Sequence, residues 1–81
     1  MSLFPGQLRA GRALIGWSQD RLAAKAKVAK ATIANFEAGR RRPYDRTLDD
    51  IREALETAGV EFIPQDGGGP GVRLRDPIEP A

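Results

Sequence analysis

The stretch from residue 18 to residue 43, SQDRLAAKAKVAKATIANFEAGRRRP, limits the possible folds more than any other part of the chain. Its apolar residues fall at the spacings of two short helices that share one buried corner; they are Leu22, Ala23, Ala26, Val28, Ile33 and Phe36. The pattern predicts a helix, a tight turn and a second helix. The second helix then exposes Lys30, Ala31, Ala34 and Asn35, and we expect function on that face.

Local signals set the bounds of the predicted helices, which cover residues 7–15, 19–26, 30–37 and about 47–58. Pro5 suits the first turn of the first helix, because its missing N–H has no intrahelical partner there. Ser18 can cap the second helix by accepting a backbone N–H. Thr47 and Asp50 resemble a capping box for the last helix, which Gly59 ends. Trp17 is expected to pack down as a core anchor.

Beyond the helices the composition changes, and residues 60–63 and 72–75 each alternate in the manner of a short strand. Two strands alone are marginal in water, so they must pair as a hairpin on the helices or with a second subunit. We therefore divide the chain into a helix-turn-helix domain, residues 1–59, and a β extension and tail, residues 60–81. Dimerisation is assigned to the apolar strand residues Val60, Phe62, Val72 and Leu74.

Charge is distributed unevenly along the chain. Residues 1–46 carry ten Lys or Arg and three Asp or Glu, a net +7, whereas residues 47–81 carry three and eight, a net −5; together they give the +2 of the whole chain. The basic half suits a polyanion and the acidic half suits a surface that faces away from it. Solvated helix faces are the alternative reading, which the arginine cluster beside the helical pair disfavours.

The composition also excludes several kinds of chemistry. The chain has no cysteine and no histidine, which rules out disulfides, thiolate nucleophiles and imidazole metal ligands. Its carboxylates form no pattern that we can tie to a reaction, so neither an enzyme nor a cofactor or metal site is expected. No apolar run approaches the ~20 residues that cross a bilayer, and no signal peptide is evident. A soluble cytoplasmic protein is expected.

From Gln7 to about Phe62 the sequence resembles the lambda-repressor-like helix-turn-helix family, of the Cro/repressor or xenobiotic-response-element type. The resemblance rests on Ser18, Gln19, Leu22, Ala23, Val28, Ile33, Glu37, Gly39, Arg40 and Pro43. It implies a mainly α fold of four to five helices, here with a short C-terminal β-strand or hairpin extension. Members are dimeric DNA-binding transcription regulators, so double-stranded DNA and a second copy of the chain are the implied partners.

The resemblance also implies roles for individual residues. Base contacts fall to Lys30, Ala31, Thr32, Ala34 and Asn35. DNA backbone contacts fall to Gln19, Arg40, Arg41 and Arg42, with Lys27 as a further candidate. The periodicity of the first helix turns Arg12 inward, where a charge needs a partner, and the family commonly pairs that arginine with the residue that is Glu37 here.

Two positions depart from the family pattern. Lys27 stands where the turn usually has Gly, so either the turn differs or a residue with a side chain adopts positive φ at a cost of roughly 1 kcal/mol. Ala29 stands where Ser or Thr often caps the next helix, a loss of about 1 kcal/mol.

Three functions fit these observations. The first is a sequence-specific transcription regulator that binds a palindromic operator as a homodimer. The second is an antitoxin with the same DNA-binding fold, in which residues 60–81 or the acidic last helix bind a toxin. The third is a protein-interaction module without DNA binding. Only the third predicts no salt-dependent affinity for DNA, and co-purification with a toxin or co-regulator separates the first two.

Overall fold

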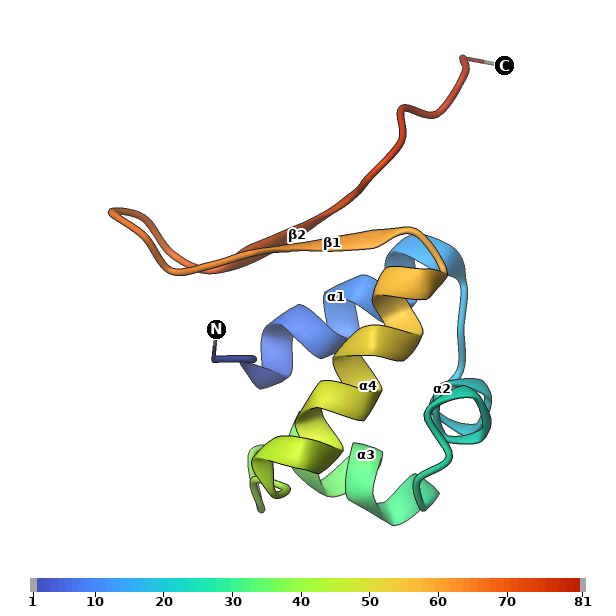
Figure 1. Ribbon diagram of the computed structural model, residues 1–81, viewed down its shortest axis with the longest axis vertical. Coiled ribbons are helices and arrows are strands. Elements are labelled where there is room, and N and C mark those ends of the chain that lie inside the picture. Colours follow the sequence, from blue (N-terminus) through green and yellow to red (C-terminus); the bar gives the residue numbers. More distant parts are fainter. Residues whose placement is uncertain (1, 81) are drawn as a thin grey trace.

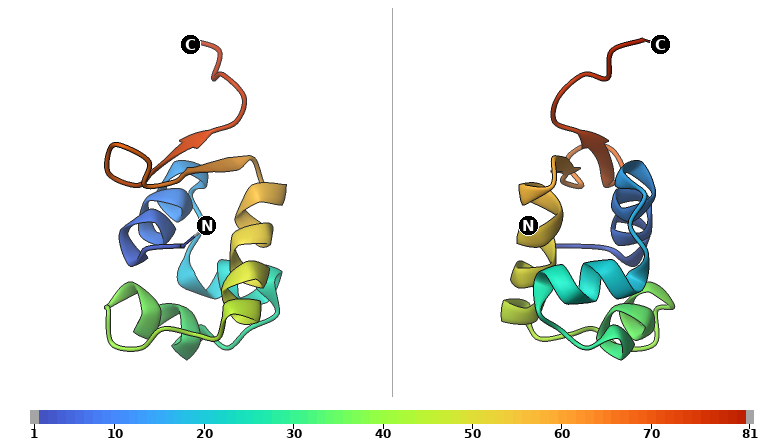
Figure 2. Two further views of the ribbon diagram at one scale, coloured as in Figure 1. Left: turned by 60° about the vertical axis from the view of Figure 1, so that its left-hand side comes forward. Right: turned by 90° about the vertical axis from the view of Figure 1, so that its right-hand side faces the viewer.

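The computed structural model of the protein describes residues 2–80, and within this range it has four helices followed by one β-hairpin. The elements are α1 (Pro5–Ile15), α2 (Gln19–Ala26), α3 (Lys30–Glu37), α4 (Asp45–Thr57), β1 (Val60–Ile63) and β2 (Gly71–Leu74). This confirms the predicted fold class, mainly helical with a short β extension. Figure 1 shows the hairpin at one end of the helical body and α3 at the other, and the views in Figure 2 agree.

The core is built from the inward faces of all four helices and of β1. Its fully buried large side chains are Leu8, Leu22, Ile33, Ile51, Leu55 and Val60. Gly11 on α1 faces β1 and α4, where a Cβ would be in ordinary van der Waals contact with Val60 Cγ1 at 3.4 Å and Leu55 Cδ1 at 3.5 Å. Trp17 is half-buried and packs against this core, as its predicted anchoring role requires.

The helix ends follow the predicted capping signals only in part. Ser18 Oγ accepts the Arg21 N–H at 3.0 Å, so α2 has its expected cap. The start of α4 was predicted wrongly: the helix begins at Asp45, and its N-cap Tyr44 provides no side-chain hydrogen bond. The Tyr44 carbonyl accepts the Leu48 N–H at 3.0 Å, which places Thr47 inside the first turn. Thr47 and Asp50 therefore form no capping box.

The two strands pair with each other within the chain, in an antiparallel register that joins Val60 to Leu74 and Ile63 to Gly71. Gln7 ties the hairpin to α1: its buried amide Nε2 donates to the Ile63 carbonyl at 3.1 Å and to the Gly71 carbonyl at 3.0 Å. The choice that the sequence left open is thus resolved in favour of an intrachain hairpin on the helices.

This packing changes the predicted dimerisation set. Val60 and Phe62 are only 2% and 7% exposed, because both side chains fill the chain's own core. In this structure they present almost no surface to a second subunit. Val72 and Leu74 are half-buried and keep some exposed apolar surface. No helix within residues 2–80 combines the length and apolar character that crossing a membrane requires.

Candidate nucleic-acid interface

A buried ion pair fixes the C-terminal end of α3. Arg12 on α1 meets both carboxylate oxygens of Glu37, with Nη2–Oε1 and Nε–Oε2 distances of 2.6 Å. The Arg12 and Glu37 side chains are 18% and 3% exposed. Hydrogen bonding to Glu37, aided by its charge, raises the pKa of the Arg12 guanidinium, and burial opposes this increase. Arg12 therefore stays charged, and its bonds to Glu37 join α1 to α3.

Further hydrogen bonds extend this ion pair into a network. Gln19 Nε2, at the start of α2, donates to Glu37 Oε1 at 3.1 Å, and Arg12 Nη1 donates to the Trp17 carbonyl at 2.9 Å. Arg9 donates to the backbone carbonyl of Glu37. Three helices thus meet at one carboxylate, which sets the angle between α2 and α3.

The side chains predicted to read bases all lie on α3. Lys30 and Ala31 are exposed, whereas Thr32, Ala34 and Asn35 are half-buried. Lys30 Nζ is 3.4 Å from the Asp20 carboxylate, but both side chains are more than half exposed, so this contact contributes little. The helix presents a narrow face with small residues beside hydrogen-bonding ones, which allows a close approach to base edges.

The turn before α3 has the geometry that the departures from the family pattern predicted. Lys27 lies in the left-handed region, at φ 59° and ψ 44°, and its N–H donates to the Ala23 carbonyl. Ala29 is the N-cap of α3 and supplies no side-chain hydrogen bond. The Thr32 N–H donates to the Ala29 carbonyl at 3.0 Å, so of the first N–H groups of α3 those of Lys30 and Ala31 are available to a bound anion.

The three arginines after α3 differ in their surroundings. Arg40 and Arg41 are exposed. Arg42 Nη1 donates to the Leu3 carbonyl at 2.9 Å, and its guanidinium carbon lies 5.8 Å from the centre of the Phe36 ring. All three residues are exposed, but Arg42 also holds the N-terminal segment against the end of α3 through these contacts.

A hollow of about 450 Å³ lies between α3 and the start of α4. It is lined by Ala31, Thr32, Asn35, Arg41, Arg42, Pro43, Tyr44 and Thr47. Sequence reasoning missed Tyr44 and Thr47 as members of this face. Tyr44 is 84% exposed, and a large aromatic next to an arginine run was the available signal. Hydroxyl, amide and guanidinium donors around one concavity suit the phosphates and sugars of a duplex.

A comparison with protein-family models identifies this arrangement. A model described as helix-turn-helix matches residues 8–62, a range that runs from α1 into β1 and includes all of α2, α3 and the arginine loop. A comparison with curated proteins finds no match to the chain.

Proposed function

The chain belongs to the lambda-repressor-like helix-turn-helix family of DNA-binding regulators, and we propose that it is a sequence-specific transcription regulator that binds a palindromic operator as a homodimer. The proposal rests on one observation: α3 is held firmly on one side by hydrogen bonds and is accessible to DNA on the other. The Arg12–Glu37 network fixes the angle of α3, while its opposite face and the neighbouring loop present polar and basic side chains.

The two kinds of contact are divided between different residues. On α3, Lys30 suits guanine acceptors, Asn35 can bond an adenine through two atoms, and Ala31 allows contact with a thymine methyl group. Thr32 and Ala34 complete this reading face.

Backbone contacts come from the ends of the helices and from the loop. One Nε2 hydrogen of Gln19 is used by Glu37, which leaves the second for a phosphate. Arg40 and Arg41 are free to neutralise phosphates, and Tyr44 and Thr47 add hydroxyl donors beside them. In a symmetric dimer the two α3 helices would enter successive major grooves, so the half-sites should lie about one helical turn apart.

The test compares two substitutions on an operator selected from random duplexes. Asn35→Ala should relax discrimination at one base pair, by about 1–3 kcal/mol, because it removes a base contact. Arg41→Ala should weaken binding to all sequences alike and reduce the slope of affinity against salt by about one. Fluorescence anisotropy at several salt concentrations measures both quantities.

Two outcomes would count against the proposal. An Asn35→Ala protein that ranks all single-base operator variants as the parent does would remove Asn35 from the reading face. A parent chain whose weak DNA binding does not depend on salt would favour the interaction module over the regulator. Glu79→Ala, a change in the exposed tail away from α3, serves as the control.

A further inference from the structure

We propose that the groove between α2 and α4 is a self-complementary surface through which two copies of this chain associate. This inference rests on the proposed homodimer and names its contact face. We call the surface the α2–α4 groove and define it by Trp17, Lys25, Ala26, Lys27, Asp50, Glu53, Ala54, Thr57 and Ala58.

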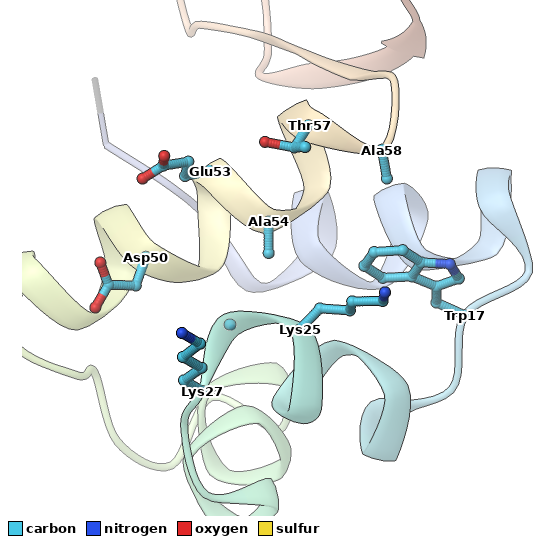
Figure 3. Close-up of a pocket in the computed structure, with 9 residues that line it drawn as sticks. Trp17, Lys25, Lys27, Asp50, Glu53, Ala54, Thr57 and Ala58 are labelled. Carbon is cyan, nitrogen blue, oxygen red and sulfur yellow. The ribbon is translucent and has the colours of Figure 1, made fainter.

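The groove is a hollow of about 620 Å³ with an apolar floor and one aromatic wall. Figure 3 shows Ala54 and Ala58 pointing from α4 toward α2, while Lys25 extends beneath them toward Trp17. Ala26 is buried below, and the Trp17 indole is half-buried at one end. Small floor residues let another helix approach closely, and a partly exposed indole is the kind of anchor that protein interfaces favour.

Charges of both signs border this floor. Lys25 and Lys27 come from the end of α2, and Asp50 and Glu53 come from α4. All four residues are exposed, and none of the ion pairs found within residues 2–80 involves any of them. The groove thus carries two positive and two negative charges, at the end of α2 and on α4 respectively, that do not pair with each other inside the chain.

This charge pattern selects the occupant. A groove that binds a different protein is expected to carry charges of mainly one sign. This groove has positive charges on one rim and an equal number of negative charges on the other, so two copies related by a two-fold rotation can place each positive rim against a negative one. Such a rotation lays α2 of one copy over α4 of the other, twice. The lysines of each copy then meet the carboxylates of the other, with the alanine floors between them.

The position of the groove is compatible with DNA binding. Figure 1 shows α3 at one end of the body, the hairpin at the other, and α2 and α4 along the flank between them. None of the residues that line the groove belongs to α3, so a second copy bound there leaves the predicted base-reading residues uncovered. The hairpin lies at the end remote from α3, and its residues Val60 and Phe62 are buried in the core. In this arrangement Lys27 faces the second copy.

A charge exchange between Lys25 and Glu53 tests the proposal. Alone, Lys25→Glu places two carboxylates opposite each other at each contact between positions 25 and 53 of the homodimer, and Glu53→Lys places two ammonium groups opposite each other there. Each variant should therefore raise the dimer dissociation constant at least about tenfold. An equimolar mixture should recover the affinity of the parent, because both pairs between the two variants are then of opposite sign. Sedimentation equilibrium of the full chain at several concentrations measures all three.

The controls separate the contact face from the dimer itself. Glu79→Lys makes the same charge change in the tail and should leave the dissociation constant unchanged. If the parent dimerises and both groove variants dimerise equally well, the groove is not the interface, although the homodimer stands. If the parent sediments as a monomer, free and on operator DNA, the homodimer fails together with the groove. Operator affinity is measured separately, so a parent without it overturns only the DNA-binding proposal.

Folding of the variants is checked by circular dichroism. Should a charge reversal unfold the chain, Lys25→Gln and Glu53→Gln take its place. Each neutral variant should then weaken the dimer in a manner that depends on salt, and their mixture should show no recovery, since no opposite charge replaces the lost one. Neutral variants that match the parent at every salt concentration would overturn the proposal.

Discussion

The two ends of α3 are held in opposite ways. At its C-terminal end, the Glu37 carboxylate is almost fully buried and is bonded by Arg12 and Gln19, while Phe36 lies under the guanidinium of Arg42. At its N-terminal end, Ala29 provides no side-chain cap and the preceding turn contains a lysine in the left-handed region. The difference indicates that the protein fixes the direction of α3 from its C-terminal end and leaves the N-terminal end without a side-chain cap.

Of the substitutions at the two ends of α3, removal of the buried Glu37 carboxylate should change stability most. Glu37→Ala leaves the charge of Arg12 without its partner in a mostly buried site, and we expect it to lower the free energy of unfolding by about 3 kcal/mol. Urea denaturation followed by circular dichroism measures the loss. Arg12→Met combined with Glu37→Leu should recover much of it, because no unpaired charge then remains. A loss below about 1 kcal/mol for Glu37→Ala would show that the network does not hold the C-terminal end.

Arg42 and Arg41 offer the next contrast at the same end of the helix. Arg42→Ala removes the hydrogen bond to Leu3 and the contact with the Phe36 ring, so it should cost about 1–2 kcal/mol of stability. Arg41→Ala should change stability by less than about 0.5 kcal/mol, because Arg41 is solvent-exposed. Thermal and urea unfolding of both variants, measured side by side, check this. Equal stabilities would mean that Arg42 does not clamp the N-terminal segment.

At the N-terminal end of α3, a substitution should raise stability rather than lower it. Lys27→Gly removes the side chain that is strained at φ 59°, and we expect it to raise stability by about 1 kcal/mol. Lys27→Ala is the matched control, since it removes the charge but keeps the strain. Because Lys27 lines the α2–α4 groove, both variants should weaken the proposed dimer alike, while only the glycine variant gains stability. A glycine variant no more stable than the alanine one would place the cost of the turn elsewhere.

The smallest expected effect is the addition of a cap. Ala29→Ser supplies an oxygen that can accept one of the first N–H groups of α3, for a gain of about 0.5 kcal/mol. Differential scanning calorimetry can resolve such a change as a small rise in Tm. No rise, combined with unchanged DNA affinity, would indicate that these N–H groups are already satisfied by water.

The local features of the fold could be predicted because their causes lie close together in sequence. The bounds of α2 and α3 agree with the apolar spacing of Leu22, Ile33 and Phe36 and with the cap at Ser18. The start of α4 was misjudged, since Thr47 has the right residue type for a cap but the helix begins earlier, just after Tyr44. Residue type alone does not tell which turn a capping residue occupies.

The features that escaped prediction join residues far apart in the chain. Gln7 meets the hairpin 56 and 64 residues away, and Arg42 reaches a carbonyl 39 residues earlier. Neither contact leaves a periodic or spaced signal. Tyr44 and Thr47 line the hollow beside α3 for the same reason, because the chain folds back there at the start of α4.

Periodicity and caps were therefore sufficient to predict the helical pair, and the resemblance was sufficient to predict its family. Of the α3 residues predicted to be exposed, Lys30 and Ala31 are exposed, whereas Ala34 and Asn35 are half-buried. The packed chain was needed to show that Val60 and Phe62 turn inward and that Arg42, exposed like Arg40 and Arg41, also contacts Leu3 and Phe36. It was needed as well to show that unpaired charges of both signs line the α2–α4 groove. The physical reason is the distance along the chain over which each interaction acts. Backbone hydrogen bonding and side-chain spacing act within one or two turns, whereas burial and charge pairing depend on which distant segments meet.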